Sequence, residues 1–358
     1  MAVAFRAALE SLPTYTPGRT VPGAIKLASN EVPFPVLPSV TAAVTAAMGD
    51  TDPAAGVHRY PDNGAAALVG ELAGILDVSP DRVVAGCGSV ALCQQIVQAV
   101  ADPGDEIVFG WRSFEAYPIV TGIVGASAVR VPVTGEHWLD LPAMAAAVTD
   151  STRLMFVCTP NNPTGTAVTR DELEDLLDDV PDRVLVVVDE AYREFDNRPD
   201  APDGVEIAGR RSNVIALRTL SKAYGLAGLR VGYAVGDPGT VAALRKVAIP
   251  FAVSSLAQVA AVAALRSRAE LESRWAQVVA ERERVTETLR DADFEVPPSQ
   301  GNFVWLPLGR RAADFARHCE DHGVIVRAFS DDSGGVRVTT GREAENDAFL
   351  SAALSWTR

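Results

Sequence analysis

The sequence has few cysteines, and they do not form a metal-binding or disulfide pattern. No CxxC pair occurs, and the four cysteines stand far apart: Cys87, Cys93, Cys158 and Cys319. Zinc ribbons and disulfide-stapled domains need closely spaced cysteines, so neither class is expected. His318 and His322 have the i, i+4 spacing of metal ligands on a helix, but no third ligand is evident. We therefore predict no metal site and interpret this pair as part of a polar helix face.

Long apolar runs and an excess of positive charge are also absent. No run approaches the roughly 18 apolar residues that span a bilayer, and the N-terminus lacks the apolar stretch of a signal peptide. With 32 Lys and Arg against 46 Asp and Glu, the net charge is −14. Such a surface repels nucleic acid and anionic membranes. The sequence predicts a cytoplasmic protein without nucleic-acid or membrane partners.

What is present predicts an α/β protein. Short apolar runs at 83–85, 106–109, 128–133, 154–158, 184–188 and 214–218 alternate with helical patterns such as 90–100 and 170–177. Apolar strands without alternation, separated by helices, indicate a mostly parallel sheet that is covered on both faces. The 358 residues are enough for one large and one smaller domain.

The pattern of residues differs at both ends of the chain from that of the α/β region. The opening stretch through Pro38 is rich in proline and predicts an extended arm. After Pro250 comes one long helical stretch, 254–290, and then strand signals at 303–308, 324–329 and 336–340 with helical patterns at 311–322 and 343–356. This order favours a small α+β domain. We predict an N-terminal arm over 1–40 that packs with the small domain, a large domain over 41–250 and a small domain over 251–358.

The strongest chemical signal is the run TLSKAYGLAGLRVGY, which begins at Thr219 and follows a predicted strand. Its lysine, Lys222, stands among hydroxyl and apolar residues, which makes it a candidate for a lowered pKa and for an amine nucleophile. Thr219, Ser221 and Arg230 together could hold a phosphate, the arginine in a bidentate manner. The alternative interpretation is a strand–turn–helix with a surface lysine.

The pattern S-K-x-x-x-L-A-G-L-R-x-G-Y resembles the lysine signature of fold-type-I aminotransferases, in the branch of histidinol-phosphate and aromatic amino acid aminotransferases. The resemblance extends over nearly the whole chain. It implies the cofactor pyridoxal 5'-phosphate (PLP), carried by Lys222 as a Schiff base. It also implies that the freed lysine moves the proton between the substrate Cα and the cofactor.

Two further motifs follow predicted strands. NNPTG begins at Asn161 after the strand 154–158, and Asp189-Glu-Ala-Tyr192 follows the strand 184–188. Active sites of α/β proteins form at such carboxyl ends, although each motif alone is also a common turn or helix cap. The resemblance implies that Asp189 keeps the pyridine nitrogen protonated. It also implies that Asn162 and Tyr192 hydrogen-bond the phenolic oxygen of the ring.

The loop GCGSVA, residues 86–91, follows a strand and opens a helix. A helix N-terminus binds phosphate through backbone N–H groups. The loop also matches a dinucleotide fingerprint, but the next strand ends without the acidic residue that binds a ribose. The resemblance implies that Ser89 and Val90 offer their backbone to the PLP phosphate. Val90 and Ala91 replace polar residues of the family pattern, which leaves Ser89 as the one side-chain candidate.

Two aromatic residues match family positions. Phe114, in WRSFEAYP, corresponds to the residue that stacks on the pyridine ring, although a single phenylalanine is more often a core residue. Tyr60, in HRYPD, resembles the tyrosine that reaches the PLP phosphate of the neighbouring subunit. This implies a homodimer with two shared sites, whereas an exposed turn tyrosine is the alternative.

Arginines are the candidates for binding the substrate. Arg337, in GGVRVT, resembles the arginine that binds the α-carboxylate, an anion that the guanidinium fork suits. Arg327 is a second candidate, for the distal end of the substrate, and an ordinary strand-edge arginine is its alternative. Tyr15 and Asn30 are expected to line the pocket.

The resemblance implies a ping-pong transfer between amino acids and 2-oxo acids. The amino group of an aromatic L-amino acid, phenylalanine first, would pass to 2-oxoglutarate and give an aromatic 2-oxo acid and L-glutamate. The segment WRSFEAYP is more similar to the aromatic branch than to the T-Y-x-x-Y segment of histidinol-phosphate enzymes. Histidinol-phosphate aminotransferase remains the alternative. PLP decarboxylases and non-catalytic PLP-fold regulators are further alternatives, and carbon dioxide release without an oxo-acid acceptor would reveal the former.

Overall fold

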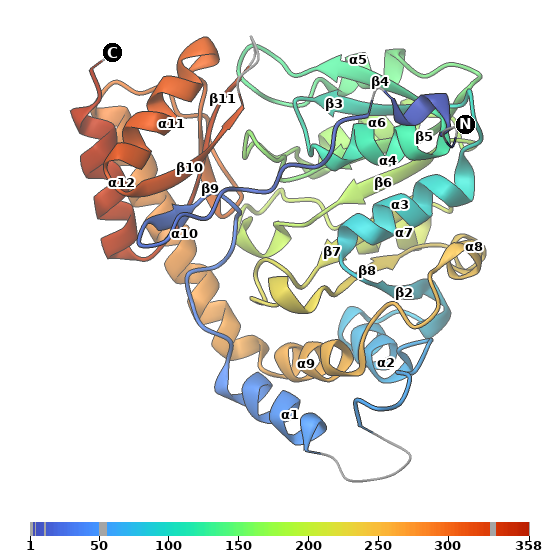
Figure 1. Cartoon of the computed structure of the whole chain (residues 1–358). Helices are drawn as coiled ribbons and strands as arrows, with labels where there is room; N and C mark the ends of the chain where they lie inside the picture. Colours follow the sequence, from blue (N-terminus) through green and yellow to red (C-terminus); the bar gives the residue numbers. More distant parts are fainter. Residues whose placement is uncertain (1–2, 4, 11, 50–55, 330–333, 358) are drawn as a thin grey trace.

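The computed structural model describes residues 3, 5–10, 12–49, 56–329 and 334–357. Its larger sheet has the strand order β2-β8-β7-β6-β5-β3-β4 (Figure 1). The strands are β2 (Val83–Gly86), β3 (Glu106–Trp111), β4 (Ser127–Pro132), β5 (Thr152–Cys158), β6 (Leu185–Asp189), β7 (Val214–Thr219) and β8 (Gly232–Val235). Strand β8 runs antiparallel to both of its neighbours, β2 and β7. The other neighbouring pairs of this sheet are parallel. The predicted mostly parallel sheet is confirmed, with β8 as a strand that the sequence patterns did not predict.

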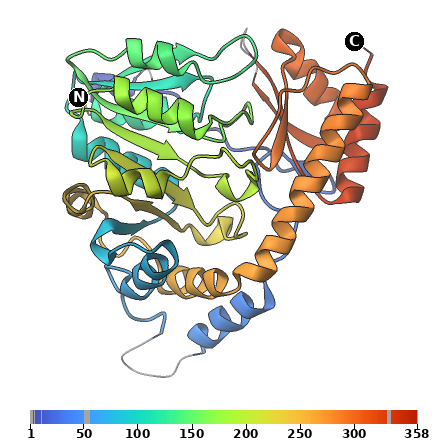
Figure 2. The same ribbon diagram turned by 180° about the vertical axis from the view of Figure 1, so that it is seen from behind.

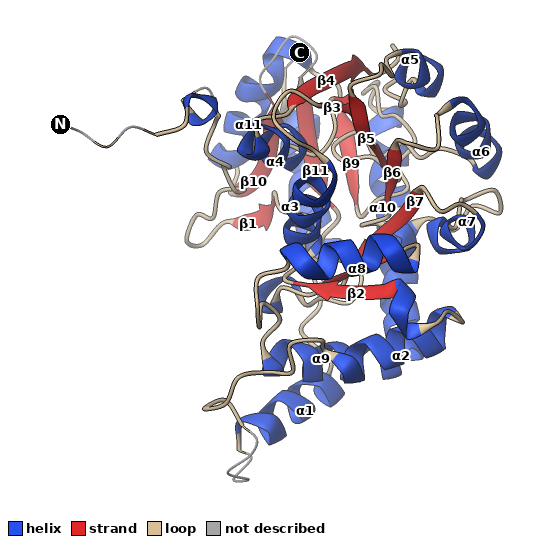
Figure 3. Cartoon of the chain, turned by 90° about the vertical axis from the view of Figure 1, so that its right-hand side faces the viewer, coloured by secondary structure: helices blue, strands red, loops and turns tan. Residues whose placement is uncertain are grey.

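Helices cover both faces of this sheet (Figure 3). On one face lie α3 (Ser89–Val100), α4 (Ala116–Val124) and α8 (Pro238–Val247). On the other lie α5 (Leu141–Ala146), α6 (Arg170–Asp179) and α7 (Gly204–Arg210). Side chains of β5 alternate between the two layers, with Phe156 in the first and Met155 and Val157 in the second. Because both faces are covered, every residue of β6 is buried.

A second sheet, with the order β1-β10-β11-β9, lies beside the first. Its strands are β1 (Ile25–Leu27), β9 (Phe303–Leu306), β10 (Val324–Phe329) and β11 (Gly335–Thr339), and it packs with α10 (Arg268–Asp291), α11 (Ala312–Asp321) and α12 (Glu343–Ser355). The proline-rich opening segment contributes β1, which pairs in parallel with β10. This strand was not predicted.

The helical stretch expected over 254–290 is two helices rather than one. The first helix is α9 (Ser255–Arg266), and α10 begins at Arg268, so Ser267 alone separates the two. The Ser267 hydroxyl bonds to the Ala263 carbonyl and to the Ser39 hydroxyl, which ties the break to the start of α1 (Pro38–Met48). Seen from behind, α10 leads from α9 toward the smaller sheet (Figure 2). Helix α9 packs against α1 and α2 (Ala66–Leu76).

Candidate active site

A cavity of about 680 Å³ lies where β5, β6 and β7 end. In a sheet with parallel neighbours these carboxyl ends share one edge, so residues far apart in sequence meet there. All sequence-predicted site residues except Tyr60 line this cavity: Tyr15, Asn30, Ser89, Val90, Phe114, Asn162, Asp189, Tyr192, Thr219, Ser221, Lys222, Arg230, Arg327 and Arg337. The structure thus brings residues from both sheets to one place.

Lys222 enters the cavity three residues after the end of β7. Its Nζ donates a 3.0 Å hydrogen bond to the Ser29 carbonyl and lies 6.0 Å from the centre of the Tyr192 ring. Burial, followed by the positive charge of Arg337, lowers the pKa of Lys222 to about 7. A substantial fraction of the amine is therefore unprotonated at neutral pH and can act as a nucleophile. The direction of this pKa shift is the one expected from the sequence.

Asp189, the last residue of β6, is buried with one oxygen unused. The Tyr117 hydroxyl donates a 2.6 Å hydrogen bond to Oδ2, whereas Oδ1 is buried without a partner. Burial raises the pKa of Asp189 to about 6, and the bond from Tyr117 acts in the opposite direction. A buried acceptor without a donor is costly and rare. The vacant acceptor position fits a positively charged ring N–H.

Arg337 and its partners form the wall next to Lys222. Its Nη1 donates to Asn162 Oδ1 at 2.5 Å and its Nη2 to the Ala28 carbonyl at 2.8 Å. The Tyr192 hydroxyl accepts a 3.0 Å bond from Asn30 Nδ2. Among the described residues no carboxylate forms an ion pair with Arg337, and burial lowers the pKa of its guanidinium. A substrate carboxylate would supply the missing counter-charge.

The loop before α3 forms an anion cradle. Gly88 has φ of +80°, and a Cβ there would lie 2.3 Å from Arg230 Nη2. The first turn of α3 begins at Ser89, and no described side chain caps its first backbone N–H groups. Arg230 Nη1 donates a 3.0 Å bond to Ser221 Oγ. A guanidinium, a hydroxyl and a helix N-terminus around one point suit a phosphate.

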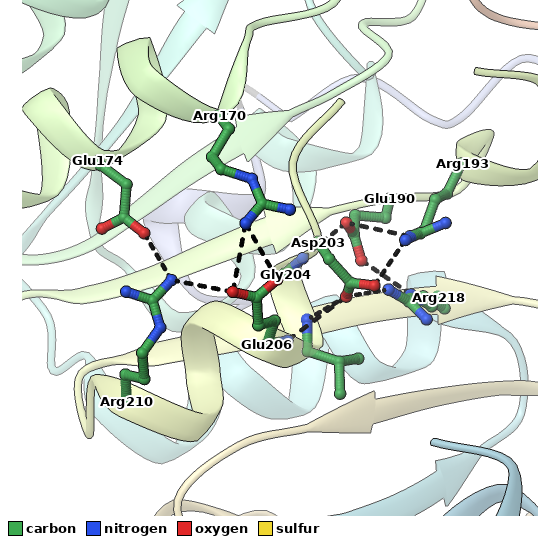
Figure 4. Close-up of polar contacts among 10 residues, drawn as sticks. Arg170, Glu174, Glu190, Arg193, Asp203, Gly204, Glu206, Arg210 and Arg218 are labelled. Carbon is green, nitrogen blue, oxygen red and sulfur yellow. Dashed lines mark hydrogen bonds and ion pairs between the residues drawn. The ribbon is translucent and has the colours of Figure 1, made fainter. Parts of the chain in front are cut away.

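A network of ion pairs lies next to the ends of β6 and β7 (Figure 4). Glu190 accepts 2.8 Å bonds from Arg218 Nε and from the Gly204 backbone N–H. Asp203 accepts bonds from Arg218 at 2.8 Å and from Arg193 at 2.5 Å. The network joins the end of β6 to the end of β7 and to the start of α7. It therefore holds the two strand ends from which the central cavity residues project.

Two contacts in the cavity were not foreseen from the sequence. Arg327 Nη2 forms a 2.8 Å ion pair with Glu115 Oε2, whereas only the arginine had been predicted. The Tyr117 hydroxyl bonds to Asp189 across 72 residues of chain. Glu115 and Tyr117 both lie in the segment WRSFEAYP, close to Phe114, so the sequence could have placed them near the site. It could not have predicted which residues they contact.

Tyr60 does not line the cavity in the single chain. It is 81% exposed and stacks on Phe251, with the ring centres 4.6 Å apart. Its role toward a second subunit stays a prediction. His318 Nε2 contacts the Ala352 carbonyl and the Ser355 hydroxyl. Within the described ranges there is no group of three or more residues that could hold a metal ion, and no helix is long and apolar enough to cross a membrane.

Comparisons with known proteins agree with this geometry. The family model described as aminotransferase class I and II matches residues 22–352. The aromatic amino acid aminotransferase of Rhodococcus jostii is 56% identical over 350 residues, which cover 98% of this chain and 95% of that protein. The protein of the same name from Mycobacteroides abscessus is 54% identical over 99% of this chain and 100% of its own length.

A solved structure has the same architecture. It is histidinol-phosphate aminotransferase from Sinorhizobium meliloti in complex with pyridoxal-5'-phosphate, which is 30% identical with a TM-score of 0.88. The superposition covers 99% of this chain and 97% of that one. Sequence, fold and cavity lead to the same conclusion: the chain belongs to the class I and II aminotransferase family.

Proposed function

We propose that this chain is a PLP-dependent aminotransferase that moves the amino group of an aromatic L-amino acid, phenylalanine first, to 2-oxoglutarate. Relatives that are 52–56% identical over nearly the full length bear the name aromatic amino acid aminotransferase. The observation that carries the chemical proposal is the pairing of a lysine of lowered pKa with a buried aspartate that has a vacant oxygen, both in one cavity.

The cavity residues fit PLP at its pyridine nitrogen, its phosphate and its aldehyde. Oδ1 of Asp189 would face the pyridine nitrogen, and the cradle of Ser89, Ser221 and Arg230 would hold the phosphate. Lys222 is the amine that would hold the cofactor covalently. Bound PLP supplies an electron sink for the pair that remains when a Cα–H bond breaks.

The chain itself handles the proton of the reaction. Lys222 Nζ has a pKa of about 7, so it can both take and release a proton near neutral pH. The Ser29 carbonyl fixes the position of this nitrogen through a 3.0 Å bond. Lys222 is thus suited to move a proton at the substrate Cα, with the amine held in place between the two transfers.

Arg337 and Asn162 would orient the substrate. The guanidinium is buried, and its neighbours Asn162 Oδ1 and the Ala28 carbonyl hold it in one plane. A bound α-carboxylate would stand against this plane in a bidentate manner. The fixed carboxylate sets which substituent of Cα points toward Lys222, and this orientation reduces the entropic part of the barrier.

We also propose that the enzyme is a homodimer in the cytoplasm, with Tyr60 contributed to the neighbouring site. Apolar side chains near Tyr60 support this assembly, since Val57, Ile249 and Phe251 are 53%, 71% and 41% exposed. The Asn63 side chain accepts a 2.7 Å bond from the Phe251 backbone, which holds the two segments together. The division into an arm over 1–40, a large domain over 41–250 and a small domain over 251–358 is part of this proposal.

Half-reactions test the donor. The purified PLP-loaded enzyme is mixed separately with phenylalanine, tyrosine, histidinol phosphate and glutamate, and the change in cofactor absorbance is followed. We expect the highest kcat/KM with phenylalanine and a clear reaction with glutamate. The highest value with histidinol phosphate would contradict the aromatic assignment. Carbon dioxide release without an oxo-acid acceptor would contradict amino transfer itself.

A further inference from the structure

A second arginine faces the cavity beside Arg337. Arg327 on β10 is the register partner of Arg337 on β11, and both side chains line the cavity. Like charges directly opposite each other on neighbouring strands repel, so each needs an anion nearby. Arg337 has no carboxylate partner among the described residues, whereas Arg327 has Glu115 at 2.8 Å. The charge of the Arg327 guanidinium is therefore balanced by a carboxylate, whereas no described carboxylate balances that of Arg337.

Glu115 contacts Arg327 from the segment that joins β3 of the larger sheet to α4. It precedes α4, directly after Phe114, and meets Arg327 across 212 residues of chain. The side chains of Arg327 and Glu115 are 16% and 32% exposed, so the pair is only partly screened by solvent. The other oxygen of Glu115 lies 3.8 Å from Arg112 Nη1. The carboxylate thus lies between two cations at the cavity wall.

Apolar side chains line part of the cavity that this pair faces. Phe114, Ile119, Ile123 and Phe329 line the same cavity, and the Arg327 guanidinium lies 5.4 Å from the centre of the Phe329 ring. An aromatic side chain that enters this region removes water from the pair. Desolvation of a lone guanidinium would be costly, while desolvation of a paired one costs much less. An aromatic substrate therefore needs Glu115 on Arg327.

A dicarboxylate, in contrast to an aromatic substrate, needs the Arg327 guanidinium to be available for its second carboxylate. The proposed function requires the same cavity to take glutamate and 2-oxoglutarate, whose second carboxylate stands where an aromatic ring would otherwise lie. With the α-carboxylate on Arg337, that second carboxylate points along the wall to which Arg327 belongs. Glu115 then occupies the one guanidinium that the substrate anion needs.

We propose that Glu115 is a specificity-determining residue that lets one cavity accept both side chains, an inference that rests on the proposed function. With an aromatic substrate Glu115 stays on Arg327 and neutralises it. With a dicarboxylate the distal carboxylate replaces Glu115 on the guanidinium.

Binding of two unreactive analogues tests this exchange. The dissociation constants of 3-phenylpropanoate and glutarate are measured by calorimetry on the PLP-loaded wild type and on Glu115→Gln. We expect about tenfold weaker binding of 3-phenylpropanoate and severalfold tighter binding of glutarate, since removal of one charge partner changes binding by factors of this order. Arg327→Met should show the reverse, with glutarate lost and 3-phenylpropanoate retained.

A matched control is Glu320→Gln. Glu320 also forms an ion pair with an arginine, Arg19 at 2.8 Å, but it does not line this cavity. Both dissociation constants should stay within twofold of the wild type. If Glu115→Gln does not load PLP, Glu115→Asp withdraws the charge from Arg327 by one methylene and should give shifts of the same signs.

Shifts of both analogues in the same direction, or none for either, would overturn the role of Glu115. Analogue binding needs no turnover, so this result is separate from the proposed function. That function fails if the wild type does not react with phenylalanine, whatever the binding of the analogues.

Discussion

Asp189 and Glu190 are neighbours in sequence, and both are carboxylates with exposures of only 3% and 2%. Glu190 has both oxygens satisfied, by Arg218 and by the Gly204 backbone. Oδ2 of Asp189 accepts a hydrogen bond from the Tyr117 hydroxyl, and Oδ1 has no partner among the described residues. Adjacent side chains at a strand end point to opposite sides. One carboxylate therefore stabilises the scaffold, and the other is kept available for a ligand.

Removal of the cation behind Glu190 should have the largest effect. Arg218→Met removes the shared partner of the buried Glu190 and the partly exposed Asp203, which we expect to cost about 3–5 kcal/mol in free energy of unfolding, chiefly through Glu190. Chemical denaturation measures the loss. The control is Arg210→Met, whose pair with Glu174 is 53% exposed on the arginine side and should cost at most about 1 kcal/mol. Equal losses in the two variants would remove the distinction between scaffold and surface pairs.

Asp189→Asn tests the other half of the comparison, namely that this carboxylate serves a ligand and not the stability of the fold. The amide keeps the shape of the side chain but loses the charge that the cofactor nitrogen needs, so turnover should fall by about 10²–10³-fold, as for other preorganised electrostatic groups. PLP should still bind, and the ligand-free protein should unfold at no lower denaturant concentration than the wild type. Turnover close to that of the wild type would contradict the assigned role.

The stability of the ligand-free protein should depend on pH through Asp189. Its pKa is raised to about 6 from about 3.9 in the unfolded chain, so the folded state binds the proton more tightly. With respect to this group, stability is then highest below pH 4 and falls by about 3 kcal/mol in total as the pH rises through 6 to about 7. The free energy of unfolding of the wild type minus that of Asp189→Asn, measured from pH 4 to 7, isolates this contribution. A constant difference would show that Asp189 is not the titrating group.

Tyr117→Phe should have the smallest effect. It removes the side-chain donor to Asp189 and leaves the ring stacked on Phe156, with the ring centres 4.3 Å apart. A hydrogen bond to a charged group is worth about 1.5–3 kcal/mol, part of which water recovers. We expect the pKa of Asp189 to rise and turnover to fall severalfold, most strongly at low pH. A flat ratio of variant to wild-type rates between pH 5 and 8 would contradict this.

The sequence predicted those parts of the site whose signals are local. Asn162, Asp189 and Lys222 each follow an apolar run, and an apolar run with its trailing motif can be recognised without knowledge of the fold. Strand β1 has three residues, too few for a periodic pattern, and its hydrogen-bond partner β10 is remote in sequence. The break at Ser267 depends on its contact with Ser39 in α1.

Partners of the predicted residues could not be foreseen. Arg327 was chosen as a substrate ligand, but its pair with Glu115 depends on how the two sheets lie beside each other. The bond from Tyr117 to Asp189 likewise depends on how α4 packs on the larger sheet. Residue type indicates what a side chain can do, whereas the tertiary structure determines which of its atoms remain available.

The attachment point of the cofactor tests the central claim most directly. The chain has three lysines, Lys26, Lys222 and Lys246, and the first two line the cavity. Lys26 forms an ion pair with Glu31 at 2.9 Å. After borohydride reduction of the PLP-loaded enzyme and proteolysis, mass spectrometry should find the cofactor on Lys222 alone. The cofactor on Lys26 or Lys246, or a loaded enzyme with no modified lysine, would contradict the account.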